Sequence, residues 1–548
     1  MAKATRYTSE MITHYMKSGH WDATTFCDIW DRNSRDCPDR EAVVDSRTRL
    51  TWSQAKQWID RLALGLLELG IKKDEMVVSQ LPNCTELVTL RVACEKVGLL
   101  CLPVLRTYRR NEMEYILRHV DAVALLIPWI FHEFNHFQMV EQMLEHLPRL
   151  KHIIVVGENV PEGALSFSAM VRKPLERKYP PDYLDNKKCP STEFSLVLST
   201  TGTTGFPKFV EYPACANLYS GRSKKELLEM TGDDVVVGFG PGTGPNIPLY
   251  FSAPLAAAKA VMMERFEAGD ALRLIEKEKA TIACVVPAML AMMMEYPDIG
   301  NVNLSSLRLI YCTGAALDYR LGLDVEAKMG CPVIQTYGAV DGGAATGTFW
   351  KSPPRVRLQT VGAPTSGSEV KLIDSNGNAV SRGDVGEVIV RGPAFISGYF
   401  KDPEATRRVF TEDGWYRTGD LGRLDEEGNL VIVGRKKEMI IRGGQNIYPM
   451  EIENLLMAHP GISEVAVVGM PDKIMGEKAC AYVVPKPGYE LTLDDLVSYL
   501  RNRQIASYKL PERLELVEKL PLVAEVQKVD KKALQQDVAL KLQAERRK

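Results

Sequence analysis

Residues 200–208 combine four threonines, two glycines and a lysine directly after an apolar run at 194–198. The run is typical of a short buried strand, so the polar residues would form the turn after it. Glycines let the backbone turn tightly, and threonine hydroxyls beside exposed N–H groups can hold a polyphosphate. A polar turn without a ligand is the alternative interpretation. The chain has no Gly-Lys dipeptide, which excludes the P-loop of the common nucleotidases.

The composition is that of an ordinary soluble protein with more than one domain. Of 548 residues, 45% are hydrophobic and 25% are charged, and the formal net charge is −2. This balance gives no field that favours nucleic acid or an anionic membrane. The N-terminal residues lack an apolar signal core, and the longest apolar run, at 122–131, is too short to span a bilayer. We therefore expect a cytoplasmic protein with no nucleic-acid partner and no membrane span.

The eleven cysteines form no C-x-x-C pair, and several lie within apolar runs. This scatter is typical of reduced, buried thiols that pack as small hydrophobic side chains. A structural zinc site is not expected, because the spacing of zinc ligands is absent.

Strand-like and helix-like patterns alternate from residue 41 to about residue 335, which predicts an α/β domain with largely parallel sheets. A strand signal at 41–45, for example, precedes a helix predicted at 53–69, with Thr51 as its N-cap and Gly70 closing it. We also predict helical structure within residues 1–35 and a helix over 247–260.

Apolar runs at 234–239, 281–286, 307–311 and 333–338 lead into loops of glycine and small residues. Ligands of open α/β sheets bind beyond the carboxyl ends of the strands, so these loops point to one crevice. The loop at 240–246 has glycines without the dinucleotide-binding spacing. It is either a flexible connector or part of the wall of a ligand site.

Short strands and glycine turns dominate residues 353–433, where Asn376-Gly377 and Glu427-Gly428 are hairpin signals. We predict a β-rich subdomain here, which completes a large domain over residues 1–436. Residues 437–548 have the pattern of a small α+β domain, with a helix at 493–503 that begins after Thr492. The charged end of the chain, 541–548, is predicted to fray.

Later motifs carry the residue types that nucleotide chemistry needs. Residues 416–420 place Asp420 in a tight turn suited to vicinal ribose hydroxyls, and 434–438 place cations such as Arg435 at the predicted domain junction. A glycine pair at 443–444 opens a helix, and 521–532 carries lysines in a late loop. An ordinary turn residue at 420 and an ordinary surface charge at 435 are the alternatives. Each motif is common by itself, whereas the set in this order is specific.

Together with residues 200–208, these motifs resemble the adenylate-forming superfamily of acyl-CoA synthetases, peptide-synthetase adenylation domains and luciferases, over nearly the whole chain. The segments 19–21, 28–29, 507–511 and 529–532 are similar to those of stand-alone aryl-acid–AMP ligases and cyclic-carboxylate CoA ligases. The resemblance implies a large N-terminal domain of parallel α/β sheets with a β-rich subdomain. It also implies a small, mobile α+β C-terminal domain that turns about a hinge at Lys437.

The resemblance implies two half-reactions. A carboxylate attacks the α-phosphorus of ATP bound with Mg²⁺, giving an acyl-adenylate and pyrophosphate, and a thiol then attacks the acyl-adenylate. The first hypothesis is an AMP-forming ligase that joins a small or medium, aromatic or alicyclic acid to coenzyme A. The second is a stand-alone aryl-acid–AMP ligase that loads a carrier-protein pantetheine, and the third is a catalytically silent ligand-binding relative. Monomer and homodimer both stay open.

By resemblance, adenine would stack on Tyr337, although a core aromatic is the alternative there. Lys208 and Lys528 would be catalytic, with Lys528 bridging the substrate carboxylate and the α-phosphate. The ATP-binding residues would be Thr200, Thr201, Gly202, Thr203, Thr204, Gly205, Lys208, Gly314, Ala315, Ala316, Thr336, Tyr337, Gly338, Asp420 and Arg435. The metal ligands would be Thr204 and Asp341, and the CoA-binding residues Gly443 and Gly444. The acyl pocket would be lined by Phe239, Pro245, Asn246, Val286, Cys312, Gly314 and Gly338.

Several positions depart from the family pattern. Asp341 stands where the family has the longer glutamate, although its carboxylate can still meet Mg²⁺. The lysine loop at 523–528 is one residue longer, so the role of Lys528 is a hypothesis. The loop at 242–246 lacks the histidine or aromatic residue that is common in the family. The segments expected around the acyl group contain no arginine or lysine, which favours an uncharged acyl group over a dicarboxylate.

Overall fold

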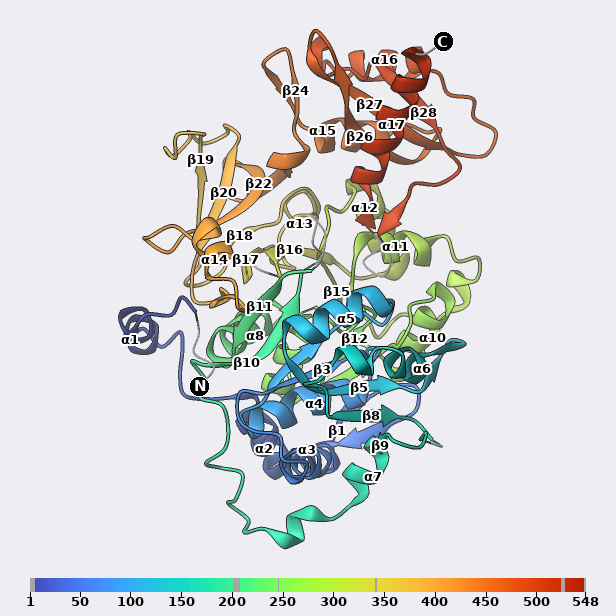
Figure 1. The fold of residues 1–548 in the computed structure, drawn as a ribbon. Helices are drawn as coiled ribbons and strands as arrows, with labels where there is room; N and C mark the ends of the chain where they lie inside the picture. Colours follow the sequence, from blue (N-terminus) through green and yellow to red (C-terminus); the bar gives the residue numbers. More distant parts are fainter. Residues whose placement is uncertain are drawn as a thin grey trace.

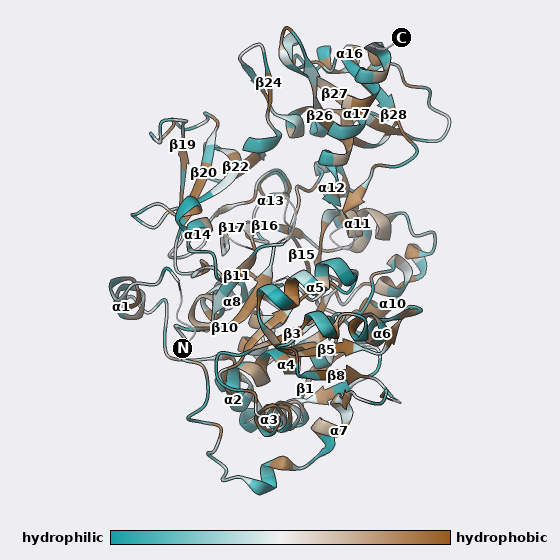
Figure 2. Cartoon of the chain, in the orientation of Figure 1, coloured by the Kyte–Doolittle hydropathy of each residue, from teal (hydrophilic) through white to brown (hydrophobic). Residues whose placement is uncertain are grey.

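Two large sheets organise the first four hundred residues of the chain (Figure 1). The computed structural model describes residues 5–158, 160–200, 207–244, 246–340, 343–523 and 528–546. One core cluster contains side chains of both sheets together with those of helix α4 (Thr85–Lys96). Eleven of the twelve residues of α4 are buried, as expected for a helix enclosed on all sides. In Figure 2 strands such as β3 and β5 are hydrophobic, which fits this shared core.

The first sheet has eight strands in the order β21-β11-β10-β4-β3-β5-β8-β9. The pairs from β10 to β9 are parallel, while β11 and β21 run antiparallel at one edge. The strand expected at 194–198 is confirmed as β10. The bounds are β3 Met76–Ser79, β4 Leu100–Pro103, β5 Ala122–Pro128, β8 His152–Val156, β9 Leu165–Ser166, β10 Phe194–Ser199, β11 Phe209–Pro213 and β21 Gly398–Tyr399.

The second sheet has nine strands in the order β18-β17-β16-β15-β14-β12-β13-β1-β2. Its central pairs are parallel and its two edges antiparallel, so the predicted α/β class is confirmed. The bounds are β1 Glu41–Val44, β2 Arg49–Thr51, β12 Val235–Gly238, β13 Lys259–Met262, β14 Ile282–Val285, β15 Leu309–Cys312, β16 Val333–Ala339, β17 Gly343–Gly347 and β18 Ala363–Pro364.

The helix predicted at 53–69 is α3 (Trp52–Glu68), and its ends follow the predicted signals. Thr51 and Gln54 form a reciprocal capping box at the start. Gly70 follows the last turn with φ +78°, a left-handed conformation that glycine adopts without strain. The other helices of the large sheets are α1 Ser9–Lys17, α2 Phe26–Asp36, α5 Arg110–His119, α6 His136–Glu141, α7 Phe167–Arg172, α8 Ala214–Leu227, α9 Ala253–Ala256, α10 Ala268–Glu278, α11 Pro287–Met294, α12 Tyr319–Met329 and α13 Pro354–Gln359.

The helix predicted at 247–260 is wrong in its last four residues, 257–260. A π-helical turn, Pro248–Ser252, leads into the short helix α9 (Ala253–Ala256). Ala257 ends this helix, because it takes the left-handed conformation with φ +54°, and its N–H donates to the Pro254 carbonyl at 3.1 Å. The residues after it form β13, which pairs with β1 on one side and with β12 on the other.

A four-stranded antiparallel sheet supplies the expected β-rich part. Gly377 and Gly428 have φ near +87° and +86°, as the predicted tight turns require. The helix α14 (Pro403–Val409) precedes its third strand. The strands, in spatial order, are β19 Glu369–Ile373, β20 Gly386–Arg391, β22 Tyr416–Leu424 and β23 Leu430–Arg435.

Residues beyond 440 form a separate five-stranded sheet with its own two hydrophobic clusters. The predicted N-cap Thr492 accepts from the Asp495 N–H at the start of α16. The prediction of a frayed end is wrong for 541–546, because α17 continues to Arg546, and Lys541 and Glu545 form ion pairs with Glu515 and Arg513. The bounds are β24 Ile440–Arg442, β25 Gln445–Ile447, α15 Pro449–Met457, β26 Ile462–Asp472, β27 Gly476–Pro485, α16 Leu493–Arg501, β28 Arg513–Leu516, β29 Leu522–Val523, β30 Lys528–Val529 and α17 Lys531–Arg546.

The cysteines behave as predicted. All eleven are free, and ten of them are buried. Across the described ranges, no helix combines the length and the apolar character needed to cross a membrane.

Candidate nucleotide and acyl site

The hydroxyl-rich loop joins two adjacent antiparallel strands, β10 and β11. The Thr200 N–H donates to the Lys208 carbonyl at 2.8 Å, so the two ends of the loop are held together. Lys208 is exposed, and its ammonium lies 5.2 Å from the ring centre of Tyr399. The strand pair therefore presents a cation at the carboxyl end of β10. The predicted residues Thr201, Gly202, Thr203, Thr204 and Gly205 lie outside the described residues.

Asp420 is the centre of a cluster that joins two sheets. It faces Arg435 across the β22–β23 pair, with Arg435 Nε 3.2 Å from Asp420 Oδ1. The Tyr337 hydroxyl, from β16 of the nine-stranded sheet, donates to Asp420 Oδ2 at 2.6 Å. Asp420 is 8% exposed, whereas the Arg435 side chain is 46% exposed. The carboxylate is therefore held rigidly while the guanidinium stays accessible to a ligand.

The surroundings of Asp420 shift its protonation. Burial raises the pKa of the Asp420 carboxyl, and the hydrogen bond from Tyr337 and the charge of Arg435 act against this rise. The pKa of Tyr337 is raised well above its ordinary value by burial, and then by the charge of Asp420. The tyrosine thus stays a hydrogen-bond donor at neutral pH.

The turn before Asp420 is fixed by its own hydrogen bonds. Gly419 has φ +70°, and the Asp420 N–H donates to Thr418 Oγ1 at 3.0 Å. The Thr418 hydroxyl donates to the Val388 carbonyl at 2.7 Å. A pocket of about 370 Å³ opens beside this turn, and its lining is rich in cations: Thr418, Gly419, Arg435, Lys436 and Lys437.

Lys528 comes from β30, about a hundred residues after Asp420, and it lies close to the cluster. Its side chain is exposed, yet the neighbouring residues lower its pKa, first by desolvation and then through the positive charge of Arg435. The charges of Asp420 and Glu438 act in the opposite direction. Three sequence-predicted residues, Asp420, Arg435 and Lys528, thus meet at one place. The predicted hinge residue Lys437 lies in the short 3₁₀ turn between them.

Further predicted ATP-binding residues lie at the ends of strands β15 and β16 of the nine-stranded sheet. Gly314, Ala315 and Ala316 are exposed beyond β15, and Gly314 has φ +90°. Thr336 is buried and donates to the Tyr311 hydroxyl at 2.8 Å, while Gly338 is exposed further along β16. The predicted ATP-binding residues Gly314, Ala315, Ala316 and Gly338 are therefore accessible, whereas Thr336 is buried.

The predicted acyl-pocket residues fall into two kinds. Phe239 and Cys312 are 2% and 1% exposed and belong to the core cluster of the sheet. Val286 and Asn246 are partly exposed, and a Cβ at Gly314 would lie 3.5 Å from Val286 Cγ1. The predicted residues Pro245 and Asp341 lie outside the described residues.

Gly443 and Gly444 form the tight turn between β24 and β25. Both have positive φ, +56° and +84°, which explains the glycine pair. The Gly443 N–H donates to the Met475 carbonyl at 2.8 Å, and a Cβ at Gly443 would lie 2.6 Å from Met475 Cε. A Cβ at Gly444 would meet nothing within 4 Å.

Two charged residues beside the cluster escaped the sequence analysis. The Nζ of Lys531 lies 2.7 Å from a carboxylate oxygen of Glu453 and 3.5 Å from one of Glu438. Glu438 also acts on the pKa of Asp420 and of Lys528. Only the position of Glu438, three residues after Arg435, could have suggested its place.

The described residues contain no group of three or more His, Cys, Asp and Glu that could hold a metal ion. The predicted metal ligands, Thr204 and Asp341, both lie outside the described ranges.

Residues 30–400 match the family described as AMP-binding enzyme, and residues 451–525 match the AMP-binding enzyme C-terminal domain. The chain is 32% identical to a 2-hydroxy-7-methoxy-5-methyl-1-naphthoate–CoA ligase of Streptomyces carzinostaticus, covering 96% of each chain. It is also 32% identical to a 2,3-dihydroxybenzoate-AMP ligase of Bacillus subtilis, covering 98% of each.

A solved structure has the same fold. The anthranilate CoA ligase AuaEII in complex with anthranoyl-AMP superposes with a TM-score of 0.84 at 25% identity. The match covers 95% of this chain and 98% of that one.

Proposed function

Because the chain belongs to the AMP-binding enzyme family, we propose that it joins a cyclic carboxylic acid to coenzyme A through an acyl-adenylate. The predicted membership of the adenylate-forming superfamily, and the class of AMP-forming acid–thiol ligase, are confirmed. The observation that carries the proposal is the cluster of Asp420, Tyr337 and Arg435 with Lys528 beside it.

In the first half-reaction, the Asp420 carboxylate would accept hydrogen bonds from the ribose hydroxyls, and Tyr337 and Arg435 would hold this carboxylate in place. Lys528 and Lys208 would offset charge that develops between the carboxylate oxygen and the phosphates. Such groups act by position and charge alone, because they are already oriented before the reaction. Bound Mg²⁺, held by Asp341 and Thr204, would supply further charge at the phosphates.

In the second half-reaction, the part of the chain from 437 onward would turn about Lys437 and bring Gly443 and Gly444 to the acyl-adenylate. The open space at Gly444 supports this role, because a pantetheine arm needs a path without side chains. We propose the boundary between the two domains at 436–437.

The cyclic acid is supported by the two relatives and the solved structure, whose names include a naphthoate, a dihydroxybenzoate and an anthranilate. Coenzyme A as the acceptor is supported by the naphthoate and anthranilate ligases. The 2,3-dihydroxybenzoate-AMP ligase favours the second candidate, in which the acceptor is a carrier-protein pantetheine.

A panel of aromatic and alicyclic acids, each assayed for pyrophosphate release with and without coenzyme A, tests the proposal. We expect acid-dependent release in both cases, and acyl-CoA only when coenzyme A is present. Release that never yields acyl-CoA would favour the carrier-protein candidate. A chain that binds acids but releases no pyrophosphate would be the silent relative.

Lys528→Ala tests the role of the lysine. Removing one preorganised donor from a developing charge costs about 10²–10³-fold in rate, and we expect a loss of this size in adenylation. The exposed Lys532→Ala, on the same segment, is the matched control. The assignment is wrong if Lys528→Ala still exchanges pyrophosphate at the rate of the control.

A further inference from the structure

One cation in the core faces the predicted acyl loop without a counter-ion among the described residues. Arg91 lies on α4, and its Nη2 donates to the Gly242 carbonyl of the loop 240–246. Its guanidinium stacks on the ring of Tyr250, 4.4 Å from the ring centre. Nε and Nη1 are shielded from solvent, and no described residue accepts a hydrogen bond from either.

Such an arrangement is costly for the protein alone. A buried donor without an acceptor costs about 1–3 kcal/mol, and more when it is charged. Desolvation lowers the pKa of Arg91, and no carboxylate of the described residues acts against this. Buried arginines are normally paired. A bound ligand could therefore supply the hydrogen-bond acceptor that Nε and Nη1 of Arg91 lack among the described residues.

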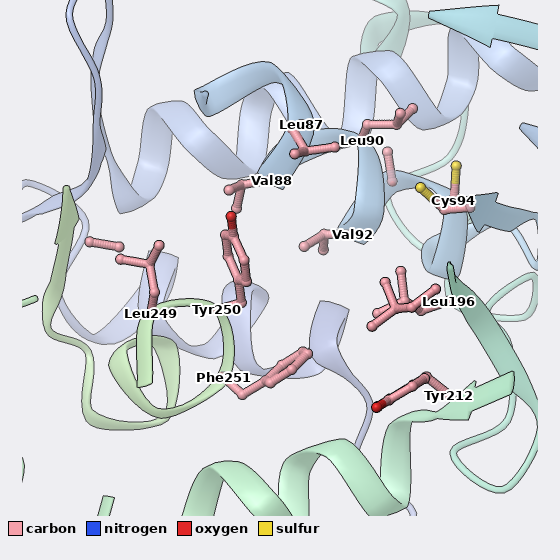
Figure 3. Close-up of a cluster of buried hydrophobic side chains, with 14 of the residues drawn as sticks. Leu87, Val88, Leu90, Val92, Cys94, Leu196, Tyr212, Leu249, Tyr250 and Phe251 are labelled. Carbon is pink, nitrogen blue, oxygen red and sulfur yellow. The ribbon is translucent and has the colours of Figure 1, made fainter. Parts of the chain in front are cut away.

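The guanidinium of Arg91 lies against the predicted acyl loop. Of the residues of α4, Arg91 is the one that is not fully buried, although the helix is enclosed by the two sheets. Figure 3 shows that Tyr250 and Phe251 point from the π-helical segment toward Val88 and Val92 of α4. Because Arg91 Nη2 donates to the Gly242 carbonyl, the guanidinium is placed on the side of the acyl loop, where Gly244 and Asn246 are partly exposed.

A polar network connects Arg91 to the predicted pocket. The Tyr250 hydroxyl donates to Asn83 Oδ1 at 2.6 Å, and Asn83 Nδ2 donates to the Gly238 carbonyl at 3.2 Å. A Cβ at Gly238 would lie 2.8 Å from Asn246 Nδ2. Arg91, Tyr250 and Asn83 thus form the polar support beneath the loop. A π-helical turn such as 248–252 frequently marks a functional site.

We propose that Arg91 is a specificity-determining residue, which selects acids that carry an oxygen acceptor on the part of the ring remote from the reacting carboxylate. The inference rests on the proposed function. The hydroxyl, carbonyl or second carboxylate of the acid accepts the hydrogen bonds that Nε and Nη1 do not make within the described part of the protein. The sequence analysis expected an acyl pocket without arginine, because the segments predicted to line it contain none. Arg91 is not in those segments: it lies on α4, about 150 residues before the loop that it contacts.

The test compares Arg91→Met with the wild type on matched acids: benzoate, 3- and 4-hydroxybenzoate, terephthalate, cyclohexanecarboxylate and 4-oxocyclohexanecarboxylate. A site built to hydrogen-bond a substrate rejects the analogue that lacks the group, by much more than a lost methylene. We expect the ratio of kcat/KM between oxygen-bearing and plain acids to fall 10- to 100-fold, mainly through KM. The panel also shows whether the neutral or the anionic acceptor is preferred.

Two controls separate selection from support of the loop. Tyr250→Phe removes the bond to Asn83 but keeps the ring under Arg91, so the ratio should stay within about twofold. Arg118→Met, on the exposed face of α5, should leave the ratio unchanged. Arg91→Met removes an unpaired buried charge, so its melting temperature should equal or exceed that of the wild type.

The outcomes are distinct. A wild type that prefers plain acids, or an Arg91→Met variant that loses all acids equally and melts earlier, overturns the inference. The inference is also overturned if Tyr250→Phe changes the kcat/KM ratio as much as Arg91→Met does. The shape of the loop, and not Arg91, would then set the selectivity. A wild type that releases no pyrophosphate with any acid contradicts the proposed function instead.

Discussion

The hydrogen bond between Tyr337 and Asp420 links the ring predicted to stack on adenine to the carboxylate predicted to bind ribose. A carboxylate must be ionised to accept two hydroxyl donors. Burial raises the pKa of Asp420, and the Tyr337 hydroxyl holds that rise back. The affinity for ATP should therefore weaken as the pH falls through the raised pKa of Asp420.

Tyr337→Phe keeps the ring and removes the hydroxyl. The pKa of Asp420 should then rise further, so the KM for ATP should increase at a higher pH than in the wild type, by about one pH unit. A pH series of KM for ATP measures this. The Tyr499 hydroxyl has no partner among the described residues, so Tyr499→Phe is the control. If the pH dependence of KM for ATP is the same in Tyr337→Phe and in the wild type, Asp420 does not bind the nucleotide.

At the scale of the elements, the sequence predicted what local chemistry determines. The cap of α3, the turns at Gly377 and Gly428, and the hydroxyl-rich loop after β10 are where residue types placed them. The π-helical segment was missed, because tertiary packing against α8 decides its form. The Tyr337–Asp420 bond was also missed, since it joins strands 83 residues apart in separate sheets.

The turn between β24 and β25 allows a matched pair of variants. Gly444 and Gly488 both have φ +84° and open space at Cβ, so valine costs about 1–2 kcal/mol of local strain at either. We expect Gly444→Val to slow transfer to coenzyme A at least tenfold and to spare adenylation, whereas Gly488→Val spares both. The two half-reactions are measured by acyl-CoA formation from preformed acyl-adenylate and by pyrophosphate exchange. If Gly444→Val and Gly488→Val have equal effects, Gly444 does not line the path of the thiol.

At the scale of the whole molecule, the C-terminal part of the chain is docked so that Lys528 lies beside Asp420 and Arg435, which is the position that the proposed adenylation needs. A second contact across the same boundary opposes it. Glu464, on β26, has a raised pKa through desolvation and through the charge of Glu295, which follows α11. The Leu520 N–H acts in the opposite direction. Like charges that face each other weaken the docked arrangement.

The sign of this effect gives a pH dependence. A raised carboxyl pKa means that docking is favoured fully below the ordinary pKa of Glu464, and that this advantage is lost as the pH rises through the raised value. Glu464→Gln mimics the neutral form at every pH. At pH 7–8 it should raise the ratio of adenylation to thiol transfer about two- to threefold, a modest factor because both carboxylates are exposed.

The measurement is that ratio for Glu464→Gln and the wild type, between pH 5 and 8 and at low and high salt. The difference should shrink toward the acid end of this range, as Glu464 gains its proton, and at high salt, where exposed charges are screened. Titration of the acceptor thiol affects both proteins equally and cancels from the comparison. Glu490→Gln, an exposed carboxylate of the same sheet region, should behave as the wild type. A difference that is independent of pH and salt would mean that Glu464 acts through packing, and not through repulsion of Glu295.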